Sequence, residues 1–219
     1  MIVLADNDLI LKLAKCDLLG SLPDLLGVPI EEIFIAPAAR YQLVHKNAAK
    51  AVAKCGNQET LDRIRAFLEL VKDIPVVKDE NLITKLGAVD GIDPGEQLLF
   101  ASCFETGDAI LVTGDRTALR ALAGSEQLAD VCQSLEKRVV TFESALLLAA
   151  KTYGFDVVKA KLLAYPGYEK EGTLKYLVRE DMIEANFVEC LVSYSREVVQ
   201  FLANSENLPV SLYEVSEPS

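Results

Sequence analysis

Two short apolar segments that each lead into an aspartate are the features that most constrain how this chain can fold. Residues 1–5 run directly into Asp6, and residues 109–113 are followed by Gly114 and Asp115. Segments this short and continuously apolar are typical of strands buried on both faces of a parallel sheet. In an open parallel sheet, ligands bind beyond the carboxyl ends of the strands. We therefore expect Asp6 and Asp115 to meet there, in an arrangement suited to a metal ion.

The composition is that of a folded protein with an excess of acidic residues. The 219 residues are 51% hydrophobic, which supplies a core and gives no indication of disorder. The length fits one domain with an extension, or two small domains. The net charge of −11 argues against binding duplex DNA through phosphate neutralisation alone. It leaves open the cleavage of nucleic acid at a carboxylate site that binds cations.

The cysteines and the apolar runs bear on where the protein works. The five cysteines are widely spaced and include no C-x-x-C pair, so they indicate neither a zinc site nor a disulfide framework. No segment resembles a signal peptide or reaches membrane-spanning length. We expect a soluble, cytoplasmic protein in a reducing environment, with no membrane partner.

Strands alternate with helices through the first two thirds of the chain. We predict strands at residues 1–5, 33–36, 74–77, 109–113 and 139–142, with helices at 9–15, 38–54, 59–72, 79–86, 94–106 and 116–123. This alternation predicts a three-layer α/β/α sandwich with a central parallel sheet over residues 1–142.

Residues 143–219 show helical periodicity only, so we predict a C-terminal helical extension. Its helices are expected at 143–153, 157–163 and 173–202, and it should add no strand to the sheet. Residues 208–213 are the segment where a strand would most readily form. The apolar stripe of the long helix either packs on its own domain or serves as a surface for a homodimer or another protein partner.

Each candidate acid has a structural interpretation beside a functional one. Asp93, Pro94 and Glu96 form the acidic version of a capping box, and Asp115 could cap a helix that begins at Arg116. Asp8 could either cap a helix that begins at Leu9 or add a further carboxylate to the site. Asp6 follows its strand with no obvious helix start that requires it.

The order and spacing of these residues resemble the PIN-domain family of metal-dependent nucleases. Residues 2–7 with Leu9 and Ile10 resemble the family's first motif, an apolar strand that ends in an aspartate. Gly95 and Glu96 with Ala101 resemble the helix motif that supplies a second acid. Residues 113–115 with Arg120 resemble the strand-end motif that supplies a third. The resemblance covers residues 1–142 and leaves the tail unmatched.

This resemblance implies a catalytic and metal-binding cluster of Asp6, Glu96 and Asp115. The cluster would hold one or two Mg²⁺ or Mn²⁺ ions and cleave phosphodiester bonds in single-stranded RNA, and an antitoxin would be a candidate protein partner. Carboxylates are the ligands that such hard cations prefer. One position departs from the family pattern, because Gln42 stands where a further acid usually follows the second strand. A neutral amide ligates weakly, which puts a second metal and the nuclease activity itself in question.

A basic row provides candidate contacts to an RNA backbone. Lys46, Lys50 and Lys54 recur every fourth residue, with Arg40 before them and Arg116 next to Asp115. The row could line a groove for nucleic acid, or it could be an ordinary solvated helix face.

Two other functions compete with the nuclease. A degenerate PIN fold retained for binding would explain Gln42 and the acidic charge without any cleavage. A phosphatase of the haloacid-dehalogenase type would use Asp6 and Asp8 as its Asp-x-Asp motif. That class needs a small hydroxyl residue soon after the second aspartate, and the chain has Leu9 and Ile10 instead.

Overall fold

The computed structural model describes residues 2–214 and contains a five-stranded sheet in which every strand pair is parallel. The strand order is β3-β2-β1-β4-β5. The strands are β1 (Ile2–Ala5), β2 (Ile33–Ile35), β3 (Lys72–Asp73), β4 (Ala109–Val112) and β5 (Val139–Val140). Leu4 in the central strand lies opposite Phe34 on one side and Leu111 on the other. The expected α/β class with a central parallel sheet is therefore confirmed.

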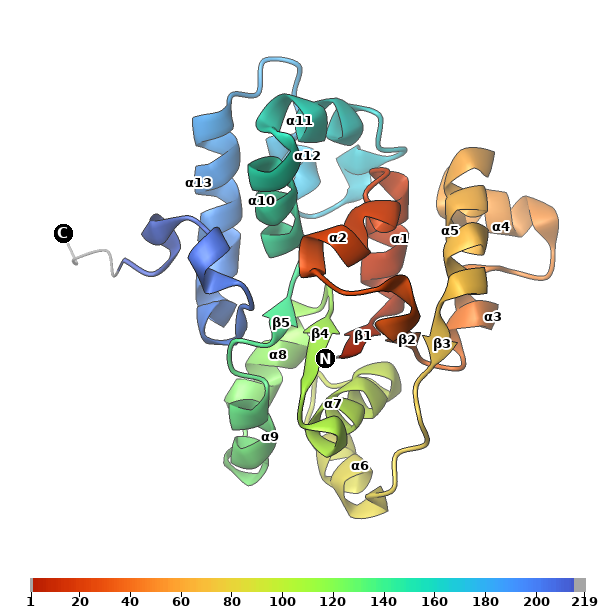
Figure 1. The fold of residues 1–219 in the computed structure, drawn as a ribbon, viewed down its shortest axis with the longest axis vertical. Coiled ribbons are helices and arrows are strands. Elements are labelled where there is room, and N and C mark those ends of the chain that lie inside the picture. Colours follow the sequence, from red (N-terminus) through yellow and green to blue (C-terminus); the bar gives the residue numbers. More distant parts are fainter. Residues whose placement is uncertain (1, 215–219) are drawn as a thin grey trace.

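Helices lie on both sides of this sheet. They are α1 (Asn7–Lys15), α2 (Leu22–Leu26), α3 (Ala39–Leu43), α4 (Ala48–Cys55), α5 (Gln58–Leu70), α6 (Glu80–Gly87), α7 (Pro94–Thr106), α8 (Arg116–Ala123) and α9 (Ala129–Ser134). Figure 1 shows α1, α2 and α5 above the sheet and α6 to α9 below it. This layout is compatible with the three-layer sandwich that the sequence predicts. Because both faces are covered, all four residues of β4 are buried.

The tail after β5 is helical. It comprises α10 (Phe142–Tyr153), α11 (Phe155–Leu163), α12 (Leu174–Leu177) and α13 (Glu184–Ser195), and α10 packs against α1, α2, α11 and α13. Residues 208–213 contain a short 3₁₀ turn, Val210–Leu212, and no strand. The tail nevertheless touches the edge of the sheet, because Leu202 makes one isolated parallel bridge with Val139. Among residues 2–214, no helix is both long and apolar enough to cross a membrane.

Three of the predicted elements are wrong in position or extent. The strand expected at 74–77 lies earlier, at β3, and its pairing ends where Ile74 donates to the Ile35 carbonyl. Pro75 follows and has no N–H group with which to continue the ladder. The single helix expected over 38–54 is two helices, since Asn47 caps a new one by accepting from the Lys50 N–H. The long helix expected over 173–202 is likewise broken, into α12, α13 and a 3₁₀ segment (Arg196–Phe201).

Candidate functional site

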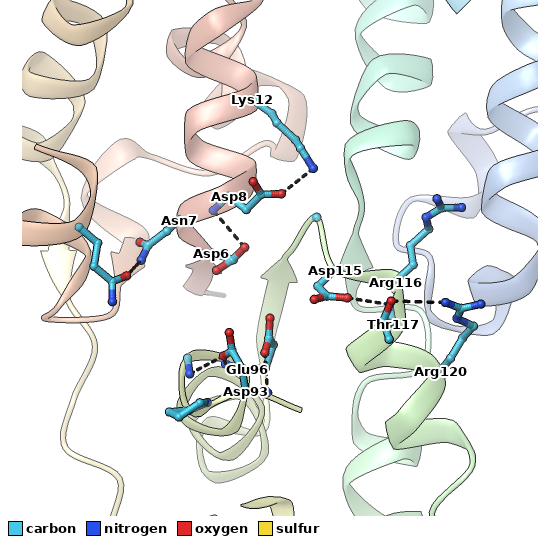
Figure 2. Close-up of a pocket in the computed structure, with 14 residues that line it drawn as sticks. Asp6, Asn7, Asp8, Lys12, Asp93, Glu96, Asp115, Arg116, Thr117 and Arg120 are labelled. Carbon is cyan, nitrogen blue, oxygen red and sulfur yellow. Dashed lines mark hydrogen bonds and ion pairs between the residues drawn. The ribbon is translucent and has the colours of Figure 1, made fainter. Parts of the chain in front are cut away.

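A pocket of about 680 Å³ opens at the carboxyl ends of β1 and β4. The sheet order reverses between these two strands, with β2 and β3 on one side and β5 on the other. Ligands in open α/β sheets bind at such a switch point. We call this cavity the acid pocket, because five of its lining residues are acidic: Asp6, Asp8, Asp93, Glu96 and Asp115. Figure 2 shows the side chains of Asp6, Glu96 and Asp115 directed toward the same open space.

Asp6 enters the pocket at the end of β1 and also caps α1. Its Oδ2 accepts from the Asp8 N–H at 3.1 Å, so α1 begins at Asn7. The expectation that no helix start requires Asp6, and the alternative that Asp8 caps the helix, are both wrong. Asp8 instead lies in the first turn and forms an ion pair with Lys12 at 2.5 Å. It lies close to the turn after β4, because a Cβ atom at Gly114 would come within 2.9 Å of its Oδ2.

Glu96 is held by the capping box of α7 that the sequence predicts. Asp93 Oδ1 accepts from the N–H groups of Gly95 and Glu96, at 2.6 and 3.0 Å. Glu96 Oε2 accepts from the Asp93 N–H at 2.8 Å, and the residue is only 6% exposed. The backbone N–H groups at this helix start therefore fix both carboxyl groups.

Asp115 caps α8. Its Oδ1 accepts from the Thr117 N–H at 2.7 Å and from the Ala118 N–H at 3.0 Å. Three helices, α1, α7 and α8, thus begin at the acid pocket with an acidic cap. Helix N-termini favour negative charge, so they offset part of the repulsion among these side chains.

Burial and crowding shift the pKa values of three of these acids. Burial raises the pKa of Asp6 to about 6, and the charges of Asp8 and Asp93 add to the increase. Burial also raises the pKa of Glu96 well above its usual value, helped by a hydrogen bond between the Glu96 and Asp93 side chains and by the charges of Asp93 and Asp115. The same hydrogen bond with Glu96 lowers the pKa of Asp93. A cation in the pocket would relieve this repulsion.

The donor chemistry of these residues fits Mg²⁺ or Mn²⁺, which prefer carboxylate oxygens. The hydrogen bonds at the three helix starts use one oxygen of each carboxylate, namely Oδ2 of Asp6, Oε2 of Glu96 and Oδ1 of Asp115. Since a carboxylate has about four lone-pair positions on two oxygens, capping and metal ligation are compatible. Within the described part of the chain, no group of three or more His, Cys, Asp or Glu side chains is arranged to hold a metal ion as it stands.

Gln42 lines the same pocket from α3. Its Oε1 accepts a short hydrogen bond from Asn7 Nδ2, which fixes the amide at the pocket edge. Asn7 Oδ1 is buried with no hydrogen-bond partner. The position where the nuclease family has a further acid thus lines the acid pocket and carries no charge.

The predicted basic row lies outside the pocket. Arg40 binds Asp73 at 2.9 Å and the carbonyls of Leu68 and Val71, so it ties α3 to the end of α5 and to β3. Lys54 donates to the Gln42 carbonyl at 2.5 Å. Lys46 and Lys50 are exposed and do not line the pocket, and their contact with RNA stays a prediction.

The cations that do line the acid pocket are Lys12, Arg116 and Arg120. Arg116 is the only one of these that the sequence nominated as an RNA contact. It donates to the Tyr194 carbonyl at 2.7 Å and pairs with Glu197, which Arg120 also binds at 2.9 Å. Lys12 and Arg120 could have been found from their spacing. Lys12 lies four residues after Asp8 and Arg120 four residues after Arg116, which places each pair on one face of a helix.

Comparisons of this chain with protein-family models, with curated proteins and with solved structures found no match.

Proposed function

We propose that this chain is a PIN-like, metal-dependent ribonuclease that cleaves single-stranded RNA at the acid pocket. The observation that carries the proposal is that Asp6, Glu96 and Asp115, from three distant parts of the chain, line one pocket at the switch point of the sheet. The raised pKa values of Asp6 and Glu96 support it, because crowded, partly buried carboxylates are typical of cation sites. The cations Lys12, Arg116 and Arg120 at the same pocket support an anionic substrate.

Each group has a role that follows from its position. Asp6, Glu96 and Asp115 would supply the oxygens that hold Mg²⁺ or Mn²⁺, while their cap hydrogen bonds keep the three helix starts in place. A bound ion of this kind supplies Lewis-acid chemistry and activates water for attack on a phosphodiester. Arg116 is oriented by the Tyr194 carbonyl and by Glu197, so its guanidinium is placed to contact a phosphate group.

The test joins metal binding to cleavage. Thermal melts with increasing Mn²⁺ should show a rising midpoint in the wild type, because binding only to the folded state stabilises it. The same preparations should cleave a fluorescently labelled single-stranded RNA with Mn²⁺ and not with EDTA. Glu96→Gln and Asp115→Asn, purified in parallel as controls against a contaminating nuclease, should lose both effects. Cleavage that survives in both variants would contradict the proposal.

A non-catalytic RNA-binding or partner-binding protein with the same fold is the second candidate. It is favoured by the neutral Gln42 at the acid pocket and by the net charge of −11. Such a protein would bind single-stranded RNA, or a partner such as an antitoxin or a second copy of itself, without cleaving RNA. Binding of RNA with no Mn²⁺-dependent change in the melting midpoint would favour this function over the nuclease.

A further inference from the structure

A second pocket, of about 310 Å³, adjoins the acid pocket and shares Lys12, Gly114 and Arg116 with it. We call it the side pocket. Its remaining wall comes from the C-terminal tail, through the start of α10, the segment around α12, and Tyr194 of α13. The helical tail that the nuclease resemblance leaves unmatched therefore forms part of a cavity next to the proposed reaction site.

Glu143 lines the side pocket with an unsatisfied carboxylate oxygen. The residue is only 4% exposed. Its Oε1 accepts from Thr173 Oγ1 at 3.0 Å and lies 3.7 Å from Arg116 Nε, whereas its Oε2 is buried with no hydrogen-bond partner. The terminal torsion of a glutamate is broad, so a small rotation can turn Oε2 toward the pocket. A buried acceptor without a partner is costly, and a ligand that donates to it removes that cost.

The aromatic rings near the side pocket are already in contact with the protein's own cations. Lys12 lies 5.8 Å from the ring centre of Phe142, Arg116 lies 4.9 Å from that of Tyr194, and Lys175 lies 4.5 Å from that of Tyr176. The protein's own cations therefore occupy these rings and would repel another. The three cations that line the pocket outnumber its two carboxylates, Glu143 and Glu171, and so favour a ligand with negative charge. Lys175 lies against one face of the exposed Tyr176 ring, and the opposite face offers a surface for a planar group. A nucleotide combines a phosphate, a planar base and N–H donors.

We infer that the side pocket binds a guanine base of single-stranded RNA, with Glu143 accepting from its Watson–Crick edge. Guanine presents two adjacent donors there, N1–H and the N2 amino group, which match the lone pairs left on the carboxylate. Adenine and cytosine each place a ring-nitrogen acceptor beside their amino donor, and uracil flanks its N–H with two carbonyls. Those acceptors repel a carboxylate. This inference rests on the proposed function, since it specifies the RNA that the same site takes, with the phosphate next to the guanine directed toward Lys12 and Arg116.

Binding in EDTA tests the inference without any cleavage. The probes are five-nucleotide RNAs of sequence UUGUU, UUAUU, UUCUU and UUUUU, with affinities measured by fluorescence anisotropy. We expect UUGUU to bind about tenfold to a hundredfold more tightly than the others, the range typical of a good two-donor base contact. Glu143→Gln should remove the preference, because its amide presents N–H groups to the donors of guanine. Glu184→Gln, on α13 and outside the pocket, makes the same change in charge and should keep the preference.

A second variant separates base identity from stacking. Tyr176→Leu should lower the affinity for all four RNAs by a similar factor. It should leave the preference for guanine intact, because stacking depends little on base identity. Equal affinity of the wild type for the four RNAs, or an unchanged guanine preference in a folded Glu143→Gln protein, would overturn the inference. A guanine preference in EDTA without any Mn²⁺-dependent cleavage would support the side pocket while the nuclease proposal failed. Mn²⁺-dependent cleavage without a preference for guanine would support the nuclease proposal and overturn the guanine site.

Discussion

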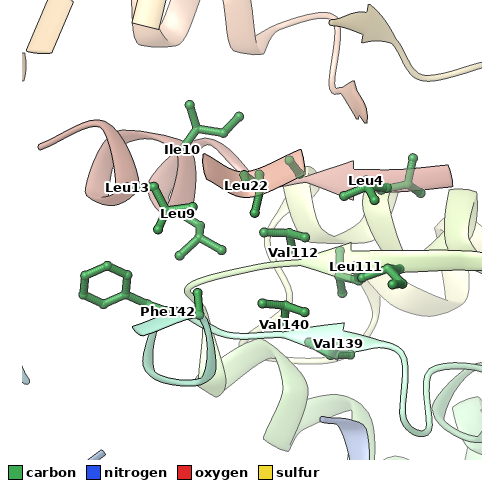
Figure 3. Close-up of a cluster of buried hydrophobic side chains, with 14 of the residues drawn as sticks. Leu4, Leu9, Ile10, Leu13, Leu22, Leu111, Val112, Val139, Val140 and Phe142 are labelled. Carbon is green, nitrogen blue, oxygen red and sulfur yellow. The ribbon is translucent and has the colours of Figure 1, made fainter. Parts of the chain in front are cut away.

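The middle of the sheet and its carboxyl edge use the same two strands for opposite purposes. Leu4, Leu111 and Val112 of β1 and β4 are fully buried with the apolar side chains of α1 and β5, as Figure 3 shows. At the carboxyl ends of the same strands, Asp6 and Asp115 line an open acidic pocket. The interior supplies stability through burial, whereas at the edge the raised pKa values of Asp6 and Glu96 oppose folding at neutral pH. Because the acid pocket lowers the stability of the fold, it is the region where we expect a ligand to bind.

The largest expected effect concerns the interior. Leu111→Ala removes a side chain that is 0% exposed and should lower the free energy of unfolding by about 2–5 kcal/mol. The matched control is Leu70→Ala at the end of α5, where the leucine is 54% exposed, and a change within about 0.5 kcal/mol is expected. Urea unfolding curves measure both. Equal losses in the two variants would remove the contrast between the interior and the surface.

The next effect separates capping from metal binding at Asp115. In EDTA, Asp115→Ala should cost about 0.5–2 kcal/mol because α8 loses its N-cap, while Asp115→Asn should be nearly silent because asparagine caps well. With Mn²⁺, both variants should lose the rise in melting midpoint that the wild type shows. An intact Mn²⁺ response in Asp115→Asn would mean that Asp115 serves only as a cap.

A smaller effect depends on pH and concerns Asp6. Its pKa is raised to about 6 in the folded protein, so the folded state holds this proton more tightly than the unfolded chain does. The favourable contribution is complete below about pH 4, the ordinary value for an aspartate, and is lost as the pH rises through about 6. Asp6→Asn keeps a capping side chain and removes this loss, so in EDTA the variant should gain about 1 kcal/mol on the wild type by pH 7, after allowance for solvent screening. Urea unfolding at pH 4, 5, 6 and 7 measures the difference, and a constant difference would contradict the assignment.

The smallest effect on stability is expected from Gln42→Glu. The new carboxylate can still accept from Asn7 Nδ2, and at this exposed position the added charge should cost no more than about 0.5 kcal/mol in EDTA. Because the residue lines the acid pocket, the Mn²⁺-dependent rise in melting midpoint should become larger than in the wild type. A smaller rise would indicate that Gln42 is not close enough to share in metal binding.

The sequence predicts the local features of the site better than the long-range ones. The continuously apolar run of β4 and the Asp93-Pro94-Gly95-Glu96 start of α7 are local patterns, and both are confirmed. The prediction of which residue caps α1 is wrong. Asp6 and Asp8 can both cap a helix, and only the folded backbone conformation selects Asp6. Pro75 could have indicated that the third strand ends before it, because proline has no N–H group to continue the ladder beyond Ile74.

The side pocket could not be predicted from local patterns. Glu143 meets Thr173 across 30 residues of sequence and Arg116 across 27, so its environment exists only after the tail has packed on the sheet. The same holds for Arg116, which is oriented by Tyr194 and Glu197 of the tail. Contacts at such separations leave no periodicity in the sequence.

A crystal soaked in Mn²⁺ gives the most direct test of the acid pocket. We predict an anomalous-scattering peak bounded by oxygens of Asp6, Glu96 and Asp115, and no peak at this place in crystals of Asp115→Asn. A soak at a concentration that saturates the thermal shift, with no peak between these three carboxylates, would contradict the metal site.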